Sequence, residues 1–233
     1  MNREELGVRV SGVAALAEPV RRDLYLYVAA QQHPVSRDQA CEGLGIARHI
    51  AKFHLDKLVE EGLLVTSFKR LSERRGPGAG RPTKLYRRSD RQLSVTVPER
   101  RYDLAGQLMA QAIEESERQG VPVLGALHSE AQQLGRSVGQ QIRSVLQRGP
   151  SRDRLLDAAS QALTAHGYEP VHEGGHLELR NCPFHLLAQQ HTGLICGMNL
   201  ALLEGAVAEV GDGKQAARLD PAPSRCCVLL IAT

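Results

Sequence analysis

The stretch SRDQACEGLGIARHIAKFHLDKLVEEGLL, residues 36–64, decides the fold of the first part of the chain. Ser36 is followed three residues later by a glutamine, which is the spacing of a capping box at the start of a helix. Gly43 and Gly45 end that helix, because glycine adopts the backbone angles of a tight turn at little steric cost. A second helix is predicted over 47–61. Two helices joined by a short glycine-containing turn indicate a helix-turn-helix.

The second predicted helix has one apolar face and one polar face. Its apolar face carries Ala51, Leu55, Leu58 and Gly62. Its polar face carries Arg48, His49, Lys52 and Asp56. We expect the first three of these polar residues to face base edges and phosphates in the major groove of double-stranded DNA. An ordinary helical hairpin is the alternative for this stretch taken alone.

A basic hairpin is predicted directly after these helices. Two strand-like runs, 64–71 and 84–88, are joined by SERRGPGAGRPT, and nine Lys and Arg residues face two acids between residues 69 and 91. Such one-sided charge beside a recognition helix favours a DNA-binding wing over a solvated loop. The thin tip at Arg81 suits a narrow minor groove. The other basic candidates for DNA contact in this region are Arg70, Arg74, Arg75 and Lys84.

Net charge is unevenly spread along the 233 residues. Residues 1–101 hold 19 Lys and Arg against 12 Asp and Glu, whereas residues 102–233 hold 10 against 14. The N-terminal part is therefore the one drawn to polyanions. Aromatic residues make up 3% of the chain, which argues against base stacking on single strands. With no signal peptide and no apolar run of membrane-spanning length, a cytoplasmic protein without a membrane partner is expected.

The order of elements predicts an α+β protein in three parts. A winged helix-turn-helix DNA-binding domain over 1–90 precedes a linker and helical dimerisation region over 91–149 and a small α+β sensor domain over 150–233. The helix expected over 123–147 has an approximate heptad seam, which favours a dimer contact, with packing inside its own domain as the alternative. The seam residues are Leu127, Ala131, Leu134, Val138 and Val145. Because two-fold DNA half-sites need a two-fold protein, a homodimer is expected.

Four of the five cysteines crowd into the last 52 residues: Cys182, Cys196, Cys226 and Cys227. The fifth, Cys41, is interpreted as a small core residue. Disulfides are not expected in a cytoplasmic chain. Cys182 precedes a predicted helix, whose dipole favours a thiolate. Since neighbouring strand residues point to opposite faces, only one of the last two cysteines is expected to reach a centre shared with the others.

Three interpretations of these cysteines remain open. The first is a metal site, with His185 or His191 as a fourth ligand beside three thiolates, holding an iron–sulfur cluster or a zinc ion. The second is a metal-free thiol switch, in which Cys182 is oxidised and resolved by Cys196 or Cys227. The third is a set of buried cysteines with no ligand.

Two further functions are compatible with the sequence. In one, the C-terminal domain is a pocket for a small apolar effector and its cysteines are structural. In the other, Cys182 is the nucleophile of an enzyme with His185 or His191 as base. No orienting acid or oxyanion hole is indicated around Cys182, so the chain is not expected to be an enzyme.

The runs FHLDKLVEEGLL at 53–64 and GRPTKLYR at 80–87 resemble the ArsR/DeoR-like winged helix-turn-helix regulators. With its cysteine-bearing tail, the whole architecture resembles the SufR-type iron–sulfur repressors. That resemblance implies a DNA-binding transcriptional repressor whose tail holds a cluster through Cys182, Cys196 and either Cys226 or Cys227. The tail departs from that pattern in two ways: Gly197-Met198-Asn199 stands where acidic residues are expected, and the closing cysteines are paired.

Overall fold

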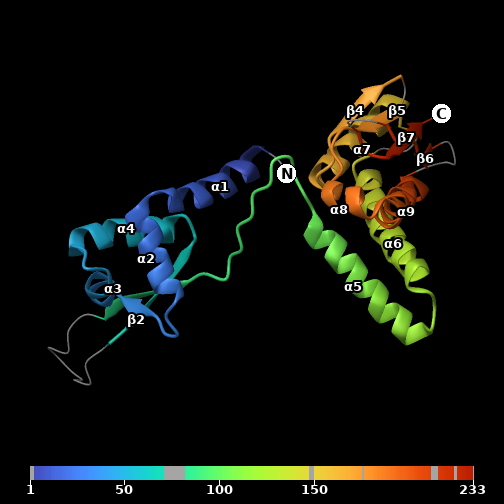
Figure 1. Cartoon of the computed structure of the whole chain (residues 1–233). Coiled ribbons are helices and arrows are strands. Elements are labelled where there is room, and N and C mark those ends of the chain that lie inside the picture. Colours follow the sequence, from blue (N-terminus) through green and yellow to red (C-terminus); the bar gives the residue numbers. More distant parts are fainter. Residues whose placement is uncertain are drawn as a thin grey trace. The chain divides into compact units, whose positions relative to one another are not determined.

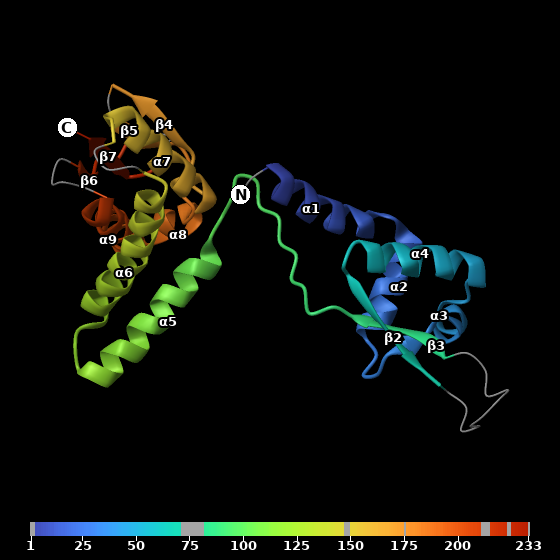
Figure 2. The same cartoon turned by 180° about the vertical axis from the view of Figure 1, so that it is seen from behind.

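The computed structural model describes residues 3–70, 82–146, 150–174, 176–210, 215–222 and 225–232. Residues 3–95 form one compact unit, and the chain from Thr96 onward forms the other. Both units combine helices with a small antiparallel sheet (Figures 1 and 2). The predicted α+β composition is therefore confirmed.

The N-terminal unit packs helices against a three-stranded sheet of order β1-β3-β2. Its helices are α1 (Arg3–Ala14), a short 3-10 helix (Ala15–Ala17), α2 (Pro19–Ala29), α3 (Arg37–Leu44) and α4 (Arg48–Glu60). Its strands are β1 (Val35–Ser36), β2 (Leu64–Lys69) and β3 (Thr83–Arg88). The predicted hairpin is confirmed as the antiparallel pair β2–β3. Its tip, residues 71–81, lies outside the described residues.

Local capping defines the helix-turn-helix, as its sequence predicted. The Ser36 hydroxyl accepts from the Gln39 backbone N–H at 3.2 Å, and the Gln39 side chain accepts from the Ser36 N–H at 2.8 Å. Gly45 then ends α3 with a φ of 65°, a left-handed conformation that favours glycine. The core behind these helices includes Leu24, Leu55 and Leu58, all fully buried.

The first helix differs from its prediction. The apolar spacing over residues 14–31 predicts a single helix from Ala14 to Gln31, but α2 begins at Pro19, and α1 precedes it as a separate helix. The Glu18 carboxylate accepts from the backbone N–H groups of Val20 and Arg21, and proline fits the first helical turn. These two local preferences start a new helix and break the longer one.

The C-terminal unit combines five helices of the described chain with a sheet of order β4-β5-β7-β6. The helices are α5 (Tyr102–Gln119), α6 (Val123–Ser144), α7 (Arg152–Ala165), α8 (His185–Gln190) and α9 (Thr192–Val210). The strands are β4 (Pro170–Glu173), β5 (His176–Leu179), β6 (Gln215–Leu219) and β7 (Val228–Ala232). Side chains of α5 and α6 share one core with α9 and the sheet, so the region expected over 91–149 does not stand apart from the rest of this unit.

Helices α6 and α9 lie side by side and form the most extensive helix contact of the unit (Figures 1 and 2). Leu127, Ala131 and Val138 of the predicted heptad seam are buried inside the unit, whereas Val145 is exposed. The preferred reading of this seam as a dimer contact is therefore wrong. Its alternative, packing inside the helix's own domain, is what the structure contains.

Helix α9 also corrects the expectation that no apolar run could reach across a membrane. It has 19 residues, and its length and composition alone would suffice for a membrane span. Half of that helix is buried inside the unit. A central core helix has the same two properties, so this single helix is weak evidence for a membrane span.

Candidate nucleic-acid interface and cysteine site

The outward surface of α4 carries the side chains expected to contact DNA. Arg48, His49 and Lys52 are all exposed in the first two turns. Ala51, Leu55 and Leu58 occupy the opposite, buried face, as their spacing predicted. The helix therefore presents three polar side chains in its N-terminal half, the part of a recognition helix that contacts base edges.

Asp38 of α3 holds Arg48 in a two-armed ion pair. The Arg48 Nε donates to Asp38 Oδ1 at 2.8 Å, and its Nη2 contacts the second carboxylate oxygen. The hydrogen bond from Arg48 is the main cause that lowers the pKa of Asp38 below its ordinary value. Because both side chains are exposed, the pair contributes little to stability, and Arg48 can exchange Asp38 for a phosphate at small cost.

Asp56 joins α4 to the wing. Its carboxylate lies 2.7 Å from the Lys84 Nζ of β3 and 3.4 Å from the Lys52 Nζ of its own helix. Burial acts to raise the pKa of Asp56, but its hydrogen bonds and charge interactions with these two lysines lower it overall. A polar groove lined by these three residues and by Arg37 runs between the helices and β3. Asp56 thus orients two cations on one basic surface.

Of the remaining predicted wing contacts, one lies within the described residues and three lie outside them. Arg70 is exposed just beyond the end of β2. Arg74, Arg75 and Arg81 lie outside the described residues.

The sequence reasoning missed Phe53, whose side chain is 64% exposed on α4. Its helical phase could have revealed it, since it stands opposite the buried positions.

Comparison with protein families matches residues 16–67 to a family described as a helix-turn-helix domain. The N-terminal unit is a helix-turn-helix domain. This domain supports a DNA-binding transcriptional regulator, consistent with the basic surface of α4 and β3. No curated protein and no solved structure matches the chain, so the comparisons assign nothing to the unit that follows the helix-turn-helix.

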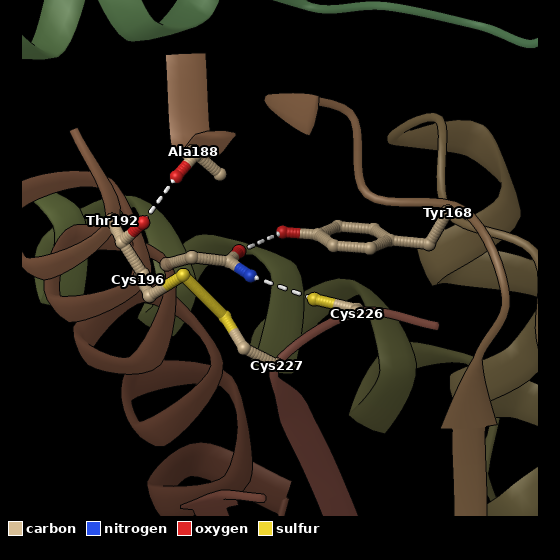
Figure 3. Close-up of a disulfide and its surroundings, with 7 residues drawn as sticks. Tyr168, Ala188, Thr192, Cys196, Cys226 and Cys227 are labelled. Atoms are coloured by element: carbon tan, nitrogen blue, oxygen red, sulfur yellow. Dashed lines mark hydrogen bonds between the residues drawn. A yellow bond between two sulfur atoms is a disulfide. The ribbon is translucent and has the colours of Figure 1, made fainter. Parts of the chain in front are cut away.

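Cys196 of α9 and Cys227, just before β7, form a disulfide (Figure 3). Their Cα atoms are 6.5 Å apart, within the usual range for this bond. The expectation of a chain without disulfides is therefore wrong for this pair. The bond links the first half of α9 to the segment just before β7, across 31 positions of sequence.

Cys182 and Cys226 form a second, reduced pair, and both are buried. The Cys226 thiol hydrogen-bonds to Cys182, and this contact is the main cause that lowers the pKa of Cys182. The same contact, together with burial, raises the pKa of Cys226. Cys182 therefore loses its proton more readily than Cys226 does.

Two buried asparagines support this second pair. Asn199 donates to the Cys226 sulfur at 3.2 Å and accepts from the Tyr168 hydroxyl. Asn181 donates to the Gly167 carbonyl at 2.6 Å and accepts from Arg100, which also donates to the Cys182 carbonyl at 3.2 Å. The sequence reasoning missed both asparagines, because their partners lie far away in the sequence.

The expected common centre of three thiolates does not match this arrangement. Cys196 is bonded to Cys227, and Cys182 pairs with Cys226, so the two adjacent cysteines serve different partners. His185 is exposed at the start of α8 and contacts Gln189. Within the described ranges, no three His, Cys, Asp or Glu side chains are grouped as a metal site requires. These residues, as arranged, do not fit a three-cysteine cluster.

Proposed function

We propose that this protein is a homodimeric transcriptional repressor whose DNA affinity depends on the oxidation state of its C-terminal cysteines. The single observation that carries the proposal is the arrangement of four cysteines as one disulfide and one hydrogen-bonded thiol pair in the same unit. Disulfides in intracellular proteins are mostly transient or redox-sensing, so a reversible bond suits a sensor. The helix-turn-helix supplies the DNA-binding output.

The position of the disulfide supports a mechanical link to the rest of the unit. Two electrons and two protons from a dithiol reductant convert the bond into the thiols of Cys196 and Cys227. This reaction releases α9 from the segment before β7. Because α9 packs closely along α6, and α6 packs on α5, movement of α9 is passed to the first helix of the C-terminal unit. Helix α5 follows the segment that connects the two units.

The homodimer rests on the symmetry of DNA sites. A regulator that binds two half-sites needs two DNA-binding domains related by a two-fold axis. The buried seam of α6 cannot supply the contact, so another surface must. Sedimentation of the purified protein measures its oligomeric state directly. A monomer at the concentrations that bind DNA would contradict the proposed homodimer.

The redox dependence is tested with a duplex selected from a random-sequence library by the purified protein. We expect its dissociation constant to differ about tenfold between oxidised and dithiothreitol-reduced protein, within the usual range of coupling between two sites. Cys196→Ser should behave as reduced protein under both conditions. Cys41→Ser, in the N-terminal unit, should keep the full redox response. Equal affinities for oxidised and reduced parent protein would contradict the sensor.

Metal analysis of protein purified without oxygen separates this mechanism from its rivals. Iron and sulfide in equal amounts would mean that the reduced cysteines rearrange around a cluster, and one zinc per chain would mean a metal site. Either result would replace the thiol switch, because the ligated sulfurs would no longer be free to form the disulfide. Protein without metal, but with a redox-dependent affinity, is the expected result.

An apolar cavity favours a second candidate, a regulator controlled by a small apolar effector. The cavity measures about 50 Å³ and is lined by aliphatic side chains of α6, α7, α9, β5 and β7, among them Ile142, Leu155, Leu177, Leu203 and Leu230. A cavity without polar partners stays dry and accepts apolar ligands. Its lining links α6 and α9, the same helices through which the disulfide would act.

Xenon serves as the probe for this second candidate, because it occupies dry apolar cavities. We expect xenon to raise the thermal midpoint of the C-terminal unit in the parent protein. Ala159→Leu, which fills the cavity from α7, should abolish that shift while the protein stays folded. If xenon leaves the parent unchanged, the cavity is too tight for a ligand and the effector function fails.

A further inference from the structure

Phe53 is a large apolar side chain at the centre of the outward surface of α4. It is 64% exposed, and Ile50 beside it is 36% exposed. The fully buried positions of the same helix, Ala51, Leu55 and Leu58, lie on the opposite side. Phe53 therefore points away from the core, one turn after the exposed side chain of His49.

The N-terminal unit does not use this ring for its own packing. Phe53 stands outside the apolar core, and its ring contact is an edge-on approach to His54, with centroids 5.1 Å apart. A ring left in water gains none of the free energy that burial provides. Its position on a recognition helix, one turn after His49, indicates that the ring contacts a binding partner instead.

We propose that Phe53 reads the C5-methyl groups of thymine in the major groove. This inference rests on DNA binding through α4. Thymine is the base that presents an apolar group on the major-groove edge, and phenylalanine is one of the side chains that contact it. His49, one turn before the ring, and Lys52, on the adjoining exposed surface, supply hydrogen-bond donors or positive charge for phosphates and neighbouring base edges. The chemistry of this face thus matches a thymine-containing half-site.

The experiment replaces thymine by uracil, which pairs in the same way but lacks the methyl group. The duplex is the tightest sequence that the parent protein selects from a random library, made with either base at each thymine position. For the parent, we expect loss of the contacted methyl to weaken binding about fourfold, the equivalent of one buried methyl group. Phe53→Ala should bind the two duplexes equally well.

Phe68→Ala is the matched control, because Phe68 is a second phenylalanine, 66% exposed, on β2 of the same unit. This variant should keep the fourfold preference for the methyl group. Affinity for a random duplex should be the same in Phe53→Ala and the parent, since phosphate contacts supply nonspecific binding.

The other possible outcomes distinguish a failure of methyl recognition from a failure of DNA binding. Specific binding by the parent with equal affinity for thymine and uracil duplexes would overturn methyl reading and leave DNA binding intact. No specific duplex for the parent would overturn DNA-sequence recognition itself. A change of oligomeric state in Phe53→Ala, with methyl dependence retained, would assign this face to a protein contact and overturn the inference.

Discussion

Gly135→Ala is expected to lower the free energy of unfolding of the C-terminal unit by about 3 kcal/mol, the upper end of the usual cost of overpacking. A Cβ atom at this position of α6 would lie 1.9 Å from the backbone carbonyl oxygen of Leu202 in α9. The reverse contact is as close, since a Cβ at Gly205 of α9 would lie 2.2 Å from the carbonyl oxygen of Gln132. Backbone cannot rotate away as a side chain does, so the two helices must separate.

Urea unfolding followed by circular dichroism measures this effect, with Gly125→Ala as the matched control. Gly125 lies in the first turn of the same helix, and a Cβ there meets nothing within 4 Å. The control should therefore gain about 0.5 kcal/mol from the higher helix propensity of alanine. If Gly135→Ala proves as stable as Gly125→Ala, the close approach of α6 and α9 is wrong.

Reduction of the Cys196–Cys227 disulfide is expected to lower the free energy of unfolding of the C-terminal unit by about 3.7 kcal/mol. The bond closes a loop of 31 positions, and the chain-entropy relation for disulfides gives this magnitude for a loop of that length. Without the bond, the unfolded chain regains the conformational freedom that the loop had removed. Thermal unfolding with and without dithiothreitol provides the measurement.

Two variants distinguish the loss of the disulfide from other effects of the reductant on stability. Cys196→Ser should show the reduced stability under both conditions, whereas Cys41→Ser should keep the full difference, because Cys41 lies in the N-terminal unit. A parent protein whose unfolding is the same with and without reductant would contradict a stabilising disulfide. It would also remove the structural basis of the proposed redox response.

The helix-turn-helix could be predicted from sequence because its signals are local. The capping box at Ser36 and the left-handed Gly45 involve residues within a few positions of each other, and the apolar spacing of α4 repeats every three or four residues. The same holds for the β2–β3 hairpin. Even the failed prediction of one long helix across Pro19 has a local cause, the cap at Glu18.

The C-terminal unit depends on contacts between residues far apart in the sequence, which linear spacing does not reveal. The backbone N–H of Cys226 donates to the carbonyl of Leu179 at 2.7 Å, which places Cys226 beside the end of β5, where Cys182 follows. Its neighbour Cys227 then turns to Cys196 on α9. The number of cysteines and their crowding were visible in the sequence.

Sequence alone thus determined the helix-turn-helix, the basic wing and the presence of a cysteine-rich C-terminal part. Tertiary structure decided which cysteines meet, which helix covers the seam of α6 and that Phe53 stands uncovered on α4. The physical reason is the range of the interactions. Caps and helical periodicity act between near neighbours in the chain, whereas sulfur pairing and helix contact depend on how distant segments pack together.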